Sequence, residues 1–223
     1  MSLDAVQVRV LGSLIEKEIT TPENYPLSLN ALVNACNQRS SRDPVLELTD
    51  DEVRQALHTL EDQGFITTVH DARVPKYEHR ARTVLNLRRD ETAVICLLML
   101  RGPQTPGELR GRSERLYAFD DISSVQSTLD RLASREASTE PPASPGATGP
   151  LVVMLPRQPG SRESRYAHLL SGAPEIPQVA SSSSTPYAPS LAERVTELES
   201  ALNHLNETLA TLQARVQTLE SSS

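Results

Sequence analysis

One unit, a helix that stops abruptly and runs into a pair of short strands, occurs twice in this chain and restricts its fold more than any other feature. In the first copy, Thr49-Asp50-Asp51-Glu52 has the pattern of a capping box, which predicts that a helix begins there. Gln63-Gly64 is typical of a helix end, and 65–69 and 76–79 predict two strands joined by a turn. The apolar row of this helix is spaced by four and then three residues: Val53, Leu57 and Leu60.

The same order of signals returns in the second half of the chain. A second capping box, Thr105-Pro106-Gly107-Glu108, begins one helix, and Asp120-Asp121 precede another. The apolar row of that next helix keeps the spacing of the first copy: Val125, Leu129 and Leu132. A strand at 151–155 is followed by Arg165-Tyr166-Ala167-His168, which resembles Lys76-Tyr77-Glu78-His79. We therefore infer an internal repeat.

Further helical segments complete each copy. The segments 3–18 and 29–37 predict two helices in the first copy, and 92–100 predicts the opening helix of the second. Three helices and a two-stranded ribbon form a winged helix. The sequence thus predicts a mainly α fold with small β-hairpins (α+β), made of two tandem winged-helix domains at 1–88 and 89–172. Because only 3% of residues are aromatic, we expect two small cores rather than one wide core.

The remainder of the chain has a different character. The segment 173–190 is Ser/Pro-rich and predicts a flexible linker, whereas 191–220 keeps an unbroken heptad pattern typical of a coiled coil. Arg and Glu at its flanking positions favour a parallel homo-oligomer, with dimer and trimer both open; a helix that folds back on its own domains is the alternative. The predicted oligomerisation residues occupy the seam: Leu191, Val195, Leu198, Leu202, Leu205, Leu209, Leu212, Val216 and Leu219.

The composition and charge of the chain restrict where the protein is located and which kind of partner it can bind. The two cysteines, Cys36 and Cys96, lie among apolar or helix-forming residues and predict buried thiols rather than a disulfide framework. The sequence has neither a signal-peptide pattern nor an apolar run long enough for a bilayer, so we expect a cytoplasmic protein with no membrane partner. The net charge is -7, yet 73–172 holds an excess of cations, nearly all of them Arg. A polyanion is therefore expected to meet the middle of the chain.

Basic residues cluster around the predicted wing of the first copy and continue into the second. If they lie on one face, we expect them to make weak, salt-sensitive contact with the phosphates of double-stranded DNA. The candidate phosphate-contacting residues are Arg73, Lys76, Arg80, Arg82, Arg88, Arg89, Arg110, Arg112 and Arg115. The candidate base-contacting residues on the two recognition helices are Arg54, Gln55, Gln126 and Arg131. Acidic helix starts oppose entry of either helix into a groove, and a solvated or internally paired basic surface is the alternative.

Enzymatic chemistry is not indicated. The paired carboxylates sit at helix starts, where capping and the helix dipole explain them. The five histidines lack metal-ligand spacing with one another or with the cysteines, and no nucleophile elbow occurs. We expect no catalytic residue, no metal and no cofactor.

Several short motifs carry a resemblance to a known family. They are Glu16-Lys17-Glu18-Ile19-Thr20-Thr21-Pro22, Asn24-Tyr25-Pro26-Leu27-Ser28-Leu29-Asn30-Ala31-Leu32, Ala35-Cys36-Asn37-Gln38 and Val74-Pro75-Lys76-Tyr77-Glu78-His79-Arg80. With these, residues 3 to about 172 resemble the YceH family of bacterial proteins of unknown function. The resemblance implies a tandem winged-helix fold and no established activity, ligand or functional residue; the coil lies outside it.

Two functions remain open. The first is a DNA-associating, transcription-related protein that uses the basic wing region, with the coil adding avidity. The second is an adaptor for a protein partner, in which the winged helices form a scaffold and the acidic first copy meets a basic surface.

Overall fold

The structure is a computed structural model that describes residues 2–70, 73–135, 149–157 and 163–173. All of these residues fall within one compact unit of the chain, Met1–Ile176. The fold is mainly helical with two small antiparallel sheets, so the predicted α+β class is confirmed. None of the helices in the described ranges is long and apolar enough to cross a membrane.

The first copy contains three helices and a three-stranded sheet. Its elements are α1 (Ala5–Thr20), the 3-10 turn η1 (Pro22–Asn24), β1 (Leu27–Ser28), α2 (Leu29–Cys36), α3 (Asp50–Asp62), β2 (Ile66–Val69) and β3 (Lys76–His79). Strand β3 lies in the middle of the sheet, between β1 and β2, and pairs with both in antiparallel fashion. The sequence predicted the hairpin β2–β3 and missed β1, which is only two residues long.

The second copy repeats this order of elements after a short connecting helix. Its elements are α4 (Ala81–Val84), α5 (Arg89–Arg101), α6 (Pro106–Ser113), α7 (Ile122–Ala133), β4 (Val152–Met154) and β5 (Tyr166–His168). Gln104 forms an isolated antiparallel bridge to Tyr166, as Leu27 of β1 pairs with Tyr77 of β3. In each copy, the residue that pairs with the tyrosine of the matching motif therefore lies shortly before the second helix, in strand β1 for the first copy and in an isolated bridge for the second.

Local capping explains where the helices begin. The hydroxyl of Thr49 accepts the amide of Glu52 at 3.3 Å, while the Glu52 carboxylate accepts the amide of Thr49 at 2.8 Å. Thr105 and Glu108 make the same reciprocal pair at the start of α6, at 3.2 and 2.9 Å. These contacts satisfy amide groups that have no partner within the helix, so both predicted capping boxes are confirmed.

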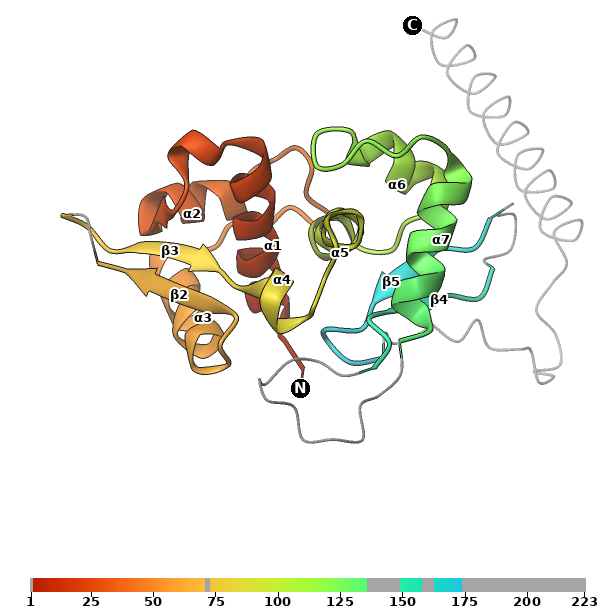
Figure 1. Cartoon of the computed structure of the whole chain (residues 1–223). Helices are drawn as coiled ribbons and strands as arrows, with labels where there is room; N and C mark the ends of the chain where they lie inside the picture. Colours follow the sequence, from red (N-terminus) through yellow and green to blue (C-terminus); the bar gives the residue numbers. More distant parts are fainter. Residues whose placement is uncertain (1, 71–72, 136–148, 158–162, 174–223) are drawn as a thin grey trace, which may run out of the picture. The chain divides into compact units, whose positions relative to one another are not determined.

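The two copies share one core, and the expectation of two separate cores is wrong. Helix α1 packs against α2 and α3 of its own copy and also against α5 of the second copy (Figure 1). The buried apolar residues of both copies form one continuous cluster. Gly12 allows the close approach, since a Cβ there would lie 3.0 Å from Leu100 and 3.2 Å from Met99. The backbone of Asp43 also donates to that of Leu100, at 2.9 Å.

Several predicted features lie outside the described residues. These are the linker beyond Ala173, the coiled coil at 191–220 with its nine seam residues, and most of the Ser/Pro/Gly segment that precedes β4. Cys36 and Cys96 fall inside the described ranges, where both are buried and free, as expected.

Candidate nucleic-acid interface

Cations follow the chain along the hairpin β2–β3 and onto the segment that leaves it. Arg73 is exposed near the turn of the hairpin, and Lys76 is half-buried at the start of β3. Arg80 is exposed directly after β3, where the chain enters α4. Strand β3 thus has cations at both of its ends. The predicted cluster of phosphate-contacting residues divides into one part on the hairpin β2–β3 and a second part beside α4 and α5.

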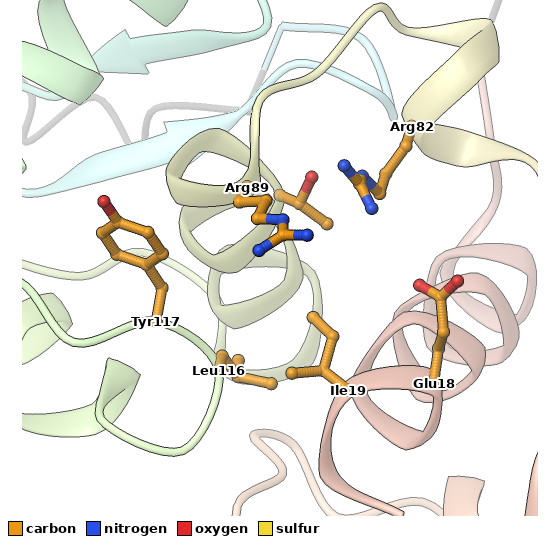
Figure 2. Close-up of a pocket in the computed structure, with 7 residues that line it drawn as sticks. Glu18, Ile19, Arg82, Arg89, Leu116 and Tyr117 are labelled. Carbon is orange, nitrogen blue, oxygen red and sulfur yellow. The ribbon is translucent and has the colours of Figure 1, made fainter. Parts of the chain in front are cut away.

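The second part of the cluster faces a groove between the two copies. The groove has a volume of about 360 Å³, and Figure 2 shows the guanidinium groups of Arg82 and Arg89 pointing into the same space. We call it the inter-repeat groove. Its lining comes from α1, α4, α5 and the loop between α6 and α7: Glu18, Ile19, Arg82, Arg89, Thr92, Leu116 and Tyr117.

A second hollow adjoins the inter-repeat groove and shares two of its residues, Glu18 and Arg82. Its volume is about 310 Å³, and His79 and Arg80 add to its lining. Three guanidinium groups therefore line the two hollows against a single carboxylate, that of Glu18.

That carboxylate already has a partner in the fold. Nε2 of His79 lies 2.9 Å from Oε2 of Glu18, and Nδ1 of the same ring accepts the amide of Ala81 at 3.3 Å. The hydroxyl of Tyr25 accepts the amide of His79 at 2.6 Å. The hydrogen bond from His79 lowers the pKa of Glu18 against the opposing effect of burial, with help from the charge of Arg82, and burial raises the pKa of Tyr25.

The cations of the segment 73–89 have no ion-pair partner. Within the described part of the chain, no carboxylate oxygen lies within 4 Å of the side-chain nitrogens of Arg73, Lys76, Arg80, Arg82, Arg88 or Arg89. Arginines elsewhere do have such partners: Arg42 pairs with Glu16 at 2.6 Å, and Arg165 with Glu108 at 3.0 Å. Within the described ranges, single arginines elsewhere, such as Arg39 and Arg115, also lack an ion pair, so what distinguishes this stretch is that its unpaired cations are close together in the chain.

Two of the three predicted phosphate-contacting arginines in the second copy already have partners within the fold. Arg110 donates to the backbone oxygen of Asp120 at 3.0 Å, and Arg112 contacts the side chains of Gln104 and Glu108. Arg115 is exposed in the loop after α6. The structure places these three on or just after α6, and none of them lines the inter-repeat groove.

The predicted base contacts differ between the two copies. Arg54 and Gln55 are exposed on α3, and the Arg54 side chain is 53% exposed with only a 3.9 Å contact to Asp51. On α7, Gln126 donates to the hydroxyl of Tyr166 at 2.7 Å, and Arg131 pairs with Asp90 and Glu91. Only the first copy therefore presents these side chains to solvent.

The sequence did not reveal that Glu18, Tyr117 and His79 belong to one surface. Glu18 and His79 lie in two of the motifs that carry the family resemblance, but no spacing links the C-terminal turn of α1 to the end of β3. Tyr117 follows α6 in a loop, where its ring packs edge-on against Phe119 with centroids 4.8 Å apart. The described residues also contain no group of three or more His, Cys, Asp or Glu that could hold a metal ion.

These features define an α+β protein in which two segments share one order of elements and an arginine-lined groove lies between them. The chain belongs to the family described as "Protein of unknown function, DUF480", whose model matches residues 3–161. The resemblance to an uncharacterised bacterial family is thereby confirmed.

Relatives match over nearly the full length of the chain. The UPF0502 protein of Koribacter versatilis is 50% identical over 204 residues, which cover 91% of this chain and 90% of the relative. The UPF0502 proteins of Aeromonas hydrophila and Vibrio parahaemolyticus are 45% and 42% identical, each over 98% of both chains. These matches extend beyond the repeats into the C-terminal segment.

Proposed function

We propose that this chain is a tandem winged-helix protein that associates with duplex DNA by contacting backbone phosphates, led by the hairpin β2–β3 and the segment after it. The observation that carries the proposal is the set of six cations between Arg73 and Arg89 that lack ion-pair partners in the described structure. Arginine forks bind phosphate in bidentate fashion, and such contacts depend little on base sequence.

The order of elements supports the winged-helix assignment. Each copy runs helix, short strand or bridge, helix, helix and hairpin, with the hairpin packed beside its third helix. In this assignment α3 and α7 are the recognition helices, and β2–β3 and β4–β5 are the wings.

The charges of the two recognition helices favour contact led by the wing. Helix α3 begins with Asp50, Asp51 and Glu52, all exposed, at the end that normally approaches phosphate. On α7, the side chains of Gln126 and Arg131 have partners within their own copy. Phosphate contact without base readout therefore fits both copies better than insertion of a helix into the major groove.

In this proposal, the C-terminal segment makes DNA binding multivalent. A parallel coil through the nine seam residues of 191–220 brings several pairs of winged helices to one DNA molecule. Linked sites bind more tightly than single ones without new contacts, so weak modules suffice.

A matched pair of double variants tests the DNA contact in the full chain. R73Q/R80Q removes two cations at the hairpin, whereas R39Q/R157Q removes two exposed arginines elsewhere. Binding to duplex DNA is measured by fluorescence anisotropy from low to high salt. Because each phosphate contact contributes a slope of about 0.9 in log K against log salt, R73Q/R80Q is expected to lower the slope by about 2 per chain, and R39Q/R157Q to leave it unchanged. The proposal is contradicted if wild-type affinity for DNA does not depend on salt concentration, or if both double variants lower the salt slope equally.

A protein adaptor is the second candidate, and the exposed acidic start of α3 favours it. Three adjacent carboxylates at Asp50, Asp51 and Glu52 form a surface for a basic partner. Capture of partners from a nuclease-treated lysate, with D50N/D51N as the comparison, separates the two functions. Partners that survive nuclease and are lost with D50N/D51N support the adaptor; loss of all partners on nuclease treatment supports DNA association.

A further inference from the structure

The inter-repeat groove combines unpaired arginines with apolar side chains in a recess, a combination that contact with DNA phosphates alone does not require. Two guanidinium groups, of Arg82 and Arg89, face a hollow of about 360 Å³, and neither has an ion-pair partner among the described residues (Figure 2). Guanidinium groups in a recess bind carboxylate or phosphate oxygens in a fixed planar geometry. The recess is therefore built for an anion.

One carboxylate of the fold, that of Glu18, also lines the groove and interacts with the charge of Arg82, but it forms no ion pair with either arginine. Oε2 of Glu18 accepts from Nε2 of His79 at 2.9 Å, which directs one carboxylate oxygen toward β3. The hydroxyl of Thr92 donates to the backbone oxygen of Arg88 at 2.7 Å. The side-chain donors left for a ligand in the groove are thus the two guanidinium groups and the hydroxyl of Tyr117.

The rest of the lining is apolar and comes from both copies. Ile19 belongs to the last turn of α1, and Leu116 and Tyr117 belong to the loop after α6. Tyr117 is 38% exposed as a residue, and its ring lies at the edge of the groove (Figure 2). A hydrated inorganic ion gains nothing from these side chains, whereas an apolar body attached to the anion does.

We propose that the inter-repeat groove is a binding site for a small organic oxyanion, a carboxylate or phosphate monoester carried on a flat apolar body. Arg82 and Arg89 hold the oxyanion, and Ile19, Leu116 and Tyr117 cover the body. Because the groove is lined by α1 of the first copy and by α5 and the α6–α7 loop of the second, the ligand contacts both repeats. The site goes beyond DNA association and does not depend on it.

Calorimetric titration of the full chain without DNA tests the site. The probes are phenyl phosphate, benzoate, inorganic phosphate and phenol. Comparing them separates the contribution of the oxyanion to affinity from that of the apolar body. Wild type is expected to bind phenyl phosphate, benzoate or both, with inorganic phosphate and phenol each at least about tenfold weaker. Binding of only one of the first two identifies which oxyanion the site takes.

Two variants assign the binding to this groove. R82Q/R89Q is expected to weaken the bound probe by about tenfold or more, whereas R39Q/R157Q removes the same charge elsewhere and leaves affinity unchanged. Y117A is expected to weaken the binding of phenyl phosphate or benzoate and to leave the affinity for inorganic phosphate unchanged. Thermal melts of all variants check folding; R82Q/R89Q should melt as wild type does, because both arginines are exposed and unpaired.

Three results overturn the proposal. They are no saturable binding of phenyl phosphate or benzoate to wild type, affinity that R82Q/R89Q leaves unchanged, and inorganic phosphate or phenol bound as tightly as the better of phenyl phosphate and benzoate. Each can occur whether or not the chain binds DNA, so failure here is distinct from failure of the DNA proposal.

Discussion

His79 and Glu18 join the end of β3 to the last turn of α1 through a 2.9 Å hydrogen bond between Nε2 and Oε2. The His79 side chain is only 2% exposed, whereas that of Glu18 is 38% exposed at the edge of the groove. Because Nδ1 accepts the amide of Ala81, the ring proton lies on Nε2 and is donated to Glu18. The contact therefore links the hairpin β2–β3 to the side of the inter-repeat groove that Glu18 lines.

Loss of the Glu18 charge is expected to reduce stability at neutral pH and to have no effect at low pH. The pKa of Glu18 is lowered from its ordinary value of 4.5, chiefly by the hydrogen bond from His79. A carboxylate with a lowered pKa in the folded state contributes stability above pH 4.5 that disappears as pH falls through the folded value. Urea unfolding should show wild type more stable than E18Q at pH 7, with the difference closing below pH 4.5. The exposed Glu47 provides the control, since E47Q should follow wild type at both pH values. A constant gap between wild type and E18Q would contradict this assignment.

His168 occupies the matching position of the second copy, and its protonation is expected to act in a different pH window. Its Nδ1 is buried without a hydrogen-bond partner, and burial lowers the pKa of the ring from 6.5 to about 4. Protonation between these values favours the unfolded chain, so stability is full above pH 6.5 and falls as pH drops toward 4. The loss is on the order of 3 kcal/mol at about 1.4 kcal/mol per pKa unit. H168L should flatten urea stability across this window; a slope equal to that of wild type would show that His168 is not its source.

The sequence predicted the features that depend on neighbouring residues. The capping boxes of Thr49 and Thr105 and the hairpin at Lys76–His79 follow from local hydrogen bonds and side-chain alternation, and the structure contains them. The repeat itself was visible because two short motifs end in Tyr, any residue and His.

The shared core was not predicted because it depends on contact between distant helices. Helix α5 is buried on all sides from Glu91 to Leu100. Its unbroken apolar run, 93–100, is typical of a helix enclosed by neighbours rather than one with a solvent face, and that signal could have indicated a shared core. The groove had no comparable signal, since Glu18, Arg82 and Tyr117 come together only when the two copies pack.

Gly12 and Gly111 offer a matched test of the contact between α1 and α5. Both lie in helices, where Gly to Ala gains about 0.8–1 kcal/mol of helix propensity. A Cβ at Gly111 meets nothing within 4 Å, but one at Gly12 comes within 3.0 Å of the buried Leu100 side chain. G111A should therefore be stabilising by up to about 1 kcal/mol, and G12A should be destabilising by about 1 kcal/mol once an overpacking cost of about 1–3 kcal/mol is included. Denaturant midpoints measure both; equal stabilisation by the two changes would show that the helices are not tightly packed at Gly12.

The pair between Arg42 and Glu16 should be the most sensitive charged contact of the first copy. The Arg42 side chain is fully buried and donates to Glu16 at 2.6 Å and to the backbone oxygen of Ala35 at 2.9 Å. Burial raises the pKa of Glu16, but the hydrogen bond and charge of Arg42 outweigh it, so the pKa is lowered overall. R42M leaves a partly buried carboxylate without its partner and is expected to cost about 3–5 kcal/mol of unfolding free energy.

The double variant E16Q/R42M is expected to recover part of that loss, because it removes the uncompensated charge as well. R39Q, in the same loop but exposed, should stay within about 0.5 kcal/mol of wild type. Urea unfolding at pH 7 of wild type, E16Q, R42M and E16Q/R42M completes a double-mutant cycle, with R39Q measured beside it. Additive losses in the double variant would mean that Arg42 acts through its contacts with the backbone of Ala35 rather than through Glu16.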